Sequence, residues 1–162
     1  MKKLFSVFLI AVMLCAVTAP AQIPALSENM FKYTKATLTA LAGGAYEKIV
    51  ANLPFSGISP SAKEWKTLAE GSFTSLSGAE PQPRYAAAWW KGQMWKIAVP
   101  VTEPAGEDVE ALVLFSEDGS SFTGYSCAPW GSVKRDLQSA DYVTWNEEYF
   151  ASTSVFVESD VN

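Results

Sequence analysis

The stretch RYAAAWWKGQMWKIAVPV, residues 84–101, decides the fold, because it places three tryptophans close together around one Lys-Gly pair. Apolar, aromatic and β-branched residues lie on both sides of Lys91 and Gly92, which is the pattern of two strands joined by a tight turn. Small residues at 86–88 leave room for large neighbours on both faces of a sheet. The stretch therefore predicts a β-hairpin in which the tryptophans pack.

The register of this hairpin has two interpretations. A two-residue turn at Lys91 and Gly92 makes residue 90 face residue 93, and it puts four large side chains on one face: Trp90, Trp95, Ile97 and Val99. A three-residue loop over 90–92, with Gly92 in a bulge, makes Trp89 the neighbour of Trp95 instead. We favour the two-residue turn, because it keeps Trp90 out of the loop.

Strand character continues beyond the hairpin. Four segments separated by polar loops are strand-like: the two hairpin strands, 85–90 and 94–102, and two later segments, 109–116 and 121–127. Short loops between consecutive strands predict an antiparallel meander, and Asp118-Gly119 is a typical hairpin turn.

The segment VEALVLF, residues 109–115, is apolar on both faces beyond Glu110. A strand of this kind is covered on both sides. We expect the N-terminal helices to cover one face. Three occupants are open for the other face: the C-terminal segment with Trp130, Trp145 and Phe150, a bound ligand, or a second copy of the chain. Packing is therefore the main role expected of the tryptophans, with ligand contact or a subunit interface as the alternative.

The region before the hairpin has helical periodicity. Apolar residues recur at spacings of three, four and seven over 26–53, which predicts a helix with Ser27 as its N-cap. Gly43 and Gly44 predict a break, because two adjacent glycines cost about 2 kcal/mol of helix propensity. A short second helix over 45–52 follows.

A third helix is expected to begin at Ser61, where Ser-Ala-Lys-Glu matches a capping box, and to stop at Gly78. Later in the chain, 132–140 and 141–150 are candidate short helices and 152–157 a candidate strand. We expect an α+β fold: residues 22–127 form N-terminal helices packed on a curved antiparallel sheet, and 128–162 form a C-terminal extension that packs on the same domain.

The first 21 residues predict export. Lys2 and Lys3 form a positive start, residues 4–17 an apolar run and 19–21 a small-x-small cleavage site. We expect a signal peptide cleaved after Ala21 and a secreted or periplasmic mature protein without a membrane span, because the run is short for a bilayer. A lipoprotein signal ending at Cys15 is the alternative, although the residue before a lipidated cysteine is normally small and here it is leucine.

Charge limits the partners. The chain has 12 basic and 17 acidic residues, and the loss of Lys2 and Lys3 leaves ten basic residues and a formal net charge of −7. A chain of this charge repels phosphate backbones and anionic lipid, which argues against nucleic acid or a membrane surface as partner.

The chain contains no histidine, which excludes Ser-His-Asp and Cys-His catalysis and an ordinary zinc site. We expect no metal and no cofactor. Cys127 would be the single cysteine of the mature chain, and we interpret it as a small buried apolar residue or as one half of an intermolecular disulfide. Carboxylates crowd two loops without calcium-site spacing, and we interpret them as solvated.

Two stretches, TALAGGAYEKIVANLPF (39–55) and WKGQMWKIAVPV (90–101), resemble the ketosteroid-isomerase and nuclear-transport-factor superfamily (SnoaL-like). The first is similar to its helix, glycine break and short helix, and the second to its glycine-then-tryptophan hairpin. The resemblance covers 27–127. It implies a pocket between helices and a concave sheet, and a short strand within 55–58. In isomerase members an Asp base works against a Tyr, and here Glu110 and Tyr125 are the counterparts that the strands supply.

The sequence leads to three functional hypotheses. The first is an exported, non-catalytic domain that binds a small apolar or aromatic ligand, or a protein partner, through an aromatic-lined sheet face; its candidate residues are Trp65, Trp90, Trp95 and Tyr125. The second is an enzyme of the isomerase or hydrolase type that uses Glu110 and Tyr125. The third is a structural homodimer with the second sheet face as its interface.

Overall fold

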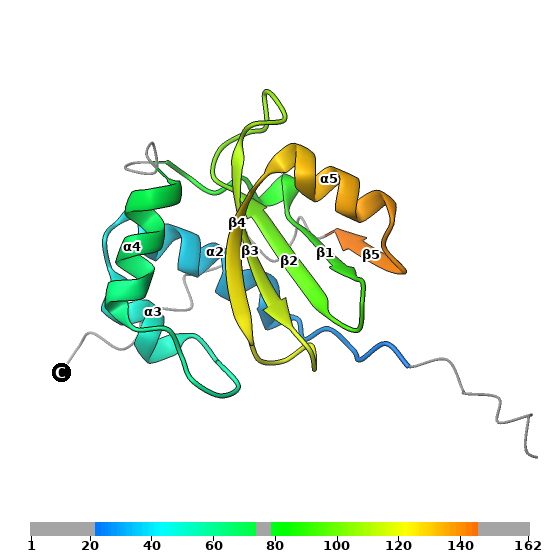
Figure 1. The fold of residues 1–162 in the computed structure, drawn as a ribbon, viewed down its shortest axis with the longest axis horizontal. Coiled ribbons are helices and arrows are strands. Elements are labelled where there is room, and N and C mark those ends of the chain that lie inside the picture. The colour runs from blue at the N-terminus through cyan, green and yellow to red at the C-terminus, as the bar shows by residue number, and fades with distance from the viewer. Residues whose placement is uncertain (1–21, 74–78, 146–162) are drawn as a thin grey trace, which may run out of the picture.

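The computed structural model describes residues 22–73 and 79–145. Within these ranges the chain has the predicted α+β fold, with helices that precede an antiparallel sheet (Figure 1). The helices are α2 (Asn29–Ala42), α3 (Tyr46–Asn52), α4 (Ala62–Ser72) and α5 (Trp130–Gln138), and a 3₁₀ turn spans Pro83–Tyr85. The strands are β1 (Ala87–Trp90), β2 (Trp95–Pro100), β3 (Glu110–Ser116), β4 (Gly124–Pro129) and β5 (Tyr142–Trp145).

The strands lie in the order β4-β3-β2-β1-β5, and every neighbouring pair is antiparallel. The first four strands form the predicted meander. The fourth begins three residues later than predicted, because the Asp118 carboxylate accepts hydrogen bonds from the backbone N–H of Ser120 and Ser121, both at 2.8 Å, and holds them in the loop. After α5 the chain adds β5 beside β1, at the opposite edge of the sheet.

The tryptophan hairpin has a register that neither sequence interpretation gave. Trp90 lies opposite Trp95, so the two turn residues are Gly92 and Gln93, one position further along the chain than predicted. Both have positive φ, 60° and 62°, as a type I′ hairpin turn requires. The predicted turn at Lys91 and Gly92 was wrong, because Lys91 belongs to the ladder: its N–H donates to the Met94 carbonyl oxygen at 3.0 Å.

The shifted turn moves the strand pairing by two residues, so each side chain keeps its predicted face. One face carries the four residues that the favoured register placed together, Trp90, Trp95, Ile97 and Val99, and all four belong to one buried cluster. Trp89 lies on the other face, so the alternative in which it neighbours Trp95 was wrong. The three tryptophans are all buried, which confirms packing as their main role.

The first face of the sheet packs against α2, α3 and α4 (Figure 1). The predicted break is confirmed, because α2 ends directly before Gly43 and Gly44 has a positive φ of 69°. The helix start was wrong by one residue: the N-cap is Glu28, while Ser27 Oγ accepts from the Asn29 N–H at 3.4 Å and the Ser27 N–H donates to the Gly119 carbonyl oxygen at 2.7 Å.

The capping box that begins α4 is confirmed. Ser61 Oγ accepts from the Glu64 N–H at 3.3 Å, and the Glu64 carboxylate accepts from the Ser61 N–H at 2.7 Å. The helix ends at Ser72, and the predicted stop at Gly78 lies outside the described residues.

The strand expected within 55–58 is reduced to a single parallel bridge between Phe55 and Phe122. Two hydrogen bonds hold it, from Ser56 N–H to the Phe122 carbonyl at 2.9 Å and from Phe122 N–H to the Pro54 carbonyl at 2.7 Å. Ile58 is almost fully exposed, so the segment leaves the core within three residues.

The second face of the sheet is covered by α5. Seven buried residues form the layer between them: Ala87, Trp89, Ala98, Ala111, Val113, Trp130 and Val133. The helix starts against the sheet, because the Trp130 N–H donates to the Val109 carbonyl oxygen at 2.7 Å. Of the three occupants open for this face, the C-terminal segment is the one observed.

The C-terminal expectations are confirmed in part. The helix expected over 132–140 is α5, which begins two residues earlier. The helix expected over 141–150 was wrong for its described part, because 142–145 pairs with β1 as β5. The candidate strand 152–157 and Phe150 lie outside the described residues.

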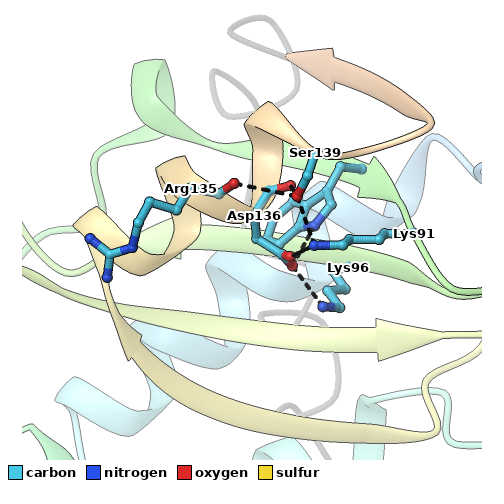
Figure 2. Close-up of polar contacts among 6 residues, drawn as sticks. Lys91, Lys96, Arg135, Asp136 and Ser139 are labelled. Atoms are coloured by element: carbon cyan, nitrogen blue, oxygen red, sulfur yellow. Dashed lines mark hydrogen bonds and ion pairs between the residues drawn. The ribbon is translucent and has the colours of Figure 1, made fainter.

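Asp136 fastens α5 to the hairpin (Figure 2). Its carboxylate accepts hydrogen bonds from Trp89 Nε1 at 3.0 Å, from Lys96 Nζ at 2.7 Å and from Lys91 Nζ. Burial raises the pKa of Asp136, but the hydrogen bonds from Lys91, Lys96 and Trp89 outweigh it and lower the pKa to about 2. The ionised carboxylate is therefore part of the cover of the second face.

We predict that Asp136→Asn destabilises the fold by about 2 kcal/mol at pH 7, because the side chain is only 24% exposed and the charged partners stay behind. The pKa of Asp136 lies below the value of about 3.9 for an unfolded aspartate, so its stabilisation is present above pH 4 and is lost as the pH falls from about 4 to about 2. Urea unfolding of both proteins at pH 7 and pH 2.5 measures this difference.

Asp141→Asn is the matched control. Asp141 is an exposed aspartate at the end of the same connection, and its backbone N–H bond to the Trp90 carbonyl survives the change. Equal stability of wild type and Asp136→Asn at pH 7, or a difference that persists undiminished at pH 2.5, contradicts the anchoring role.

Candidate functional site

A hollow of about 410 Å³ lies on the first face of the sheet, where β2 and β5 meet the start of α2. We call it the Trp95 hollow. Its walls come from an extended N-terminal strip, from α2 and from the sheet, and the lining residues are Ile23, Pro24, Ala25, Leu26, Ser27, Glu28, Phe31, Trp95, Tyr142 and Thr144. Among these ten, Glu28 alone carries a charge, so the hollow is mainly apolar and aromatic.

The N-terminal strip, residues 23–28, lies across the end of the sheet, and two hydrogen bonds to its own backbone groups hold it there. Trp95 Nε1 donates to the Pro24 carbonyl oxygen at 2.9 Å, and the Ser27 N–H donates to the Gly119 carbonyl at 2.7 Å. Gly119 has a φ of 76°, and a Cβ there would stand 2.3 Å from the Ala25 carbonyl oxygen. The strip can approach this closely only because residue 119 is glycine.

Trp95 forms the inner wall of the hollow and Tyr142 the outer wall. The two rings meet edge to face, with centroids 5.8 Å apart and planes at 89°, and Trp90 packs behind Trp95 at 5.7 Å. Tyr142 is 51% exposed, whereas Trp95 is buried. Since Pro24 already accepts the Trp95 N–H, the hollow presents ring carbon to an occupant.

The four predicted binding residues form two separate pairs. Trp95 lines the Trp95 hollow with Trp90 behind it. Trp65, on α4, stacks on Tyr125 of β4 instead, with centroids 4.2 Å apart and planes at 29°. Trp65 is fully buried, and among the described residues its Nε1 has no hydrogen-bond partner. The second pair therefore joins α4 to the sheet edge, and Tyr125 borders a shallow surface groove beside Lys63, Glu64, Thr67, Leu68 and Ser72.

The two residues of the enzyme hypothesis lie on one face of the sheet but not at one site. Glu110 pairs with Pro129, and Tyr125 pairs with Leu114, so they stand four positions apart along the strands. This corresponds to about 13 Å at the usual rise of a strand. Burial raises the pKa of Glu110, and burial followed by the nearby Glu64 charge raises the pKa of Tyr125.

Cys127 lies between these two residues on the same face, half buried and with a free thiol. Burial raises its pKa to about 12, against a smaller opposing hydrogen bond with Ser72. The thiol is thus protonated at neutral pH, which agrees with a small apolar role and not with a nucleophile.

A second hollow, of about 380 Å³, lies on the other face, beside α5. We call it the α5 groove. Its lining combines apolar sheet residues with charged side chains: Trp89, Lys91, Lys96, Val113, Phe115, Ser126, Ala128, Ser132, Val133, Arg135 and Asp136.

Sequence reasoning missed most of the Trp95 hollow. Tyr142 and Thr144 fell in a segment predicted as helix, although Tyr-Val-Thr-Trp is an aromatic and β-branched run typical of a strand. The strip 23–28 carries no motif, and only the fold brings it to Trp95. In the described part of the chain no three His, Cys, Asp or Glu side chains are grouped to hold a metal, and no described helix has the length and apolarity to cross a bilayer.

Comparison with models of known protein families found no match, and comparisons with curated proteins and with solved structures found none either. The resemblance to the ketosteroid-isomerase and nuclear-transport-factor superfamily therefore stays a prediction.

Proposed function

We propose that this chain is an exported, non-catalytic domain that binds a small apolar or aromatic molecule in the Trp95 hollow. The observation that supports it is the hollow itself, in which Phe31, Trp95 and Tyr142 surround a space of about 410 Å³. Pockets for small organic ligands commonly have volumes of about 300 to 1,000 Å³ and mostly apolar, aromatic walls.

The chemistry of the walls favours an uncharged ligand. Tyr142 offers an exposed aromatic ring, and Trp95 can offer only ring carbon because its N–H is bound to Pro24. Aromatic pairs add about 0.5 to 1.5 kcal/mol beyond simple burial. Ser27 and Thr144 supply hydroxyl groups for orientation, and Glu28 repels an anion at the rim.

The geometry supports the small ligand over the other hypotheses. A protein partner would need a broad exposed aromatic surface, yet Trp90 and Trp95 are buried, and Tyr142 is the exposed aromatic residue in the lining of the hollow. An acid-base pair would need Glu110 and Tyr125 at one site, and they are four strand positions apart. A homodimer through the second sheet face would need that face open, and α5 lies on it.

We predict that Tyr142→Ala weakens binding of N-phenyl-1-naphthylamine, a neutral fluorescent probe, by about tenfold, because the outer wall of the hollow is lost. Thr144→Trp should abolish binding by filling the space. Fluorescence titration of the mature protein measures both, with thermal unfolding as a check that the variants fold.

Trp145→Ala is the matched control. Trp145 lies on the same strand and is 53% exposed, close to the 51% of Tyr142, but it is absent from the lining of the hollow. Wild-type affinity is expected for this variant. If the probe binds Tyr142→Ala and Thr144→Trp as well as it binds wild type, the proposed ligand site is wrong.

The export part of the proposal predicts a defined mature end. Expression with the native N-terminus in a secreting host should yield a protein whose intact mass corresponds to residues 22–162, beginning at Gln22. The mass of the whole chain, or of a chain that begins at an acylated Cys15, argues against cleavage after Ala21.

A further inference from the structure

The α5 groove exists because α5 crosses the second face of the sheet diagonally. The helix begins beside the start of β3, where the Trp130 N–H bonds to Val109, and it ends beside the turn of the tryptophan hairpin, where Asp136 meets Lys91. These two points lie at opposite ends of the strands, as the pairing of β1, β2 and β3 requires. Among residues 22–73 and 79–145, no helix lies over the corner at the end of β3 and the start of β4 (Figure 1).

The floor of this corner is apolar. Val113 is buried, and Phe115 and Ala128 are half buried on the face toward α5. Two hydroxyl groups, of Ser126 on β4 and Ser132 on α5, lie in its walls. A flat or elongated apolar body would cover this floor and remove it from water.

The rim of the groove is cationic. Lys91, Lys96 and Arg135 line it, against the single carboxylate of Asp136. Glu107 approaches Arg135 at 3.9 Å, but both side chains are more than half exposed, so water screens that pair. In a chain whose formal net charge is −5, this is a local excess of positive charge beside an apolar surface.

Lys96 is positioned to contact an occupant. Its Nζ donates to Asp136 Oδ2 at 2.7 Å and lies 6.0 Å from the centre of the Trp89 ring (Figure 2). These contacts hold the ammonium at the edge of the apolar floor. An ammonium has three N–H bonds, so it can donate to Asp136 and to an anionic group at the same time.

We propose that the α5 groove is a second binding site, for a small organic anion that carries one acidic group on an apolar body. The acidic group accepts a hydrogen bond from Lys96, and the body lies over Val113 and Phe115. Arg135 lines the groove away from Lys96 (Figure 2) and adds a second positive charge that attracts an anion. This site and the Trp95 hollow are on opposite faces of the sheet and differ in charge, so each can be tested without the other.

Two fluorescent probes with one skeleton separate the sites. 8-Anilinonaphthalene-1-sulfonate differs from N-phenyl-1-naphthylamine by its sulfonate. The anionic probe should bind the mature protein at the α5 groove, with an affinity that falls as salt rises, because charge contributes to it. Excess neutral probe should not displace it.

Arg135→Met and Lys134→Met form the critical comparison. Both residues are exposed cations on α5 that lie within about 4 Å of Glu107, and both changes remove one charge, but only Arg135 lines the groove. Arg135→Met should lower the affinity for the anionic probe about fivefold. Lys134→Met should leave that affinity within about twofold of wild type. Lys96→Met should lower the affinity for the anionic probe by a similar factor or more.

Ser126→Phe tests the shape of the site without changing any charge. The larger side chain occupies the groove, so the anionic probe should lose binding while the neutral probe keeps wild-type affinity. If Lys134→Met and Arg135→Met lose equal affinity for the anionic probe, the positive charge of the protein in general attracts the probe. If the anionic probe binds Ser126→Phe as well as wild type, it lies outside the groove. Either result overturns the proposal, while failure of the neutral probe alone would count only against the Trp95 hollow.

Discussion

The structure depends on a sheet that is apolar on both faces and must be covered twice. The tryptophan hairpin attaches both covers, because the indoles of Trp89 and Trp95 point to opposite faces and each of these two donates its N–H to the element that lies there. Trp95 donates to the Pro24 carbonyl of the N-terminal strip, and Trp89 donates to the Asp136 carboxylate of α5. A buried indole N–H without a partner would cost stability, so burial and attachment are linked in the same residues.

Different elements cover the two faces of the sheet, and each cover leaves one hollow beside it. On the first face, the extended strip and the start of α2 leave space beside Trp95 and β5. On the second face, the described part of the chain supplies one short helix of nine residues over a sheet of five strands, and this helix leaves a corner open. Neither opening needs a special motif. Each is the part of an apolar face that its cover is too small to fill.

Much of the fold could be predicted from periodicity and turn chemistry, and the rest depended on long-range contacts. The break at Gly43 and the capping box at Ser61 are local, and both are confirmed. The hairpin register was wrong by two residues, because the sequence does not show which neighbour of Gly92 adopts a positive φ. The Trp95 hollow could not be assembled in advance, since residues 23–28 and 142–144 meet only when α5 carries β5 back to β1.

The use of the indole N–H groups in packing decides how the hollows can discriminate between ligands. Trp95 and Trp89 both line a hollow, but both have already given their N–H to the protein. Discrimination must then come from the shape of the ring walls and from the charges at each rim, which are opposite in sign: Glu28 at one and Lys96 with Arg135 at the other. Moving a charge from water against an apolar wall is costly unless it is paired, so a charged ligand needs a rim of the opposite sign. Two apolar hollows of similar size on opposite faces of one sheet, with rims of opposite charge, are therefore the basis of the proposed selection between neutral and anionic molecules.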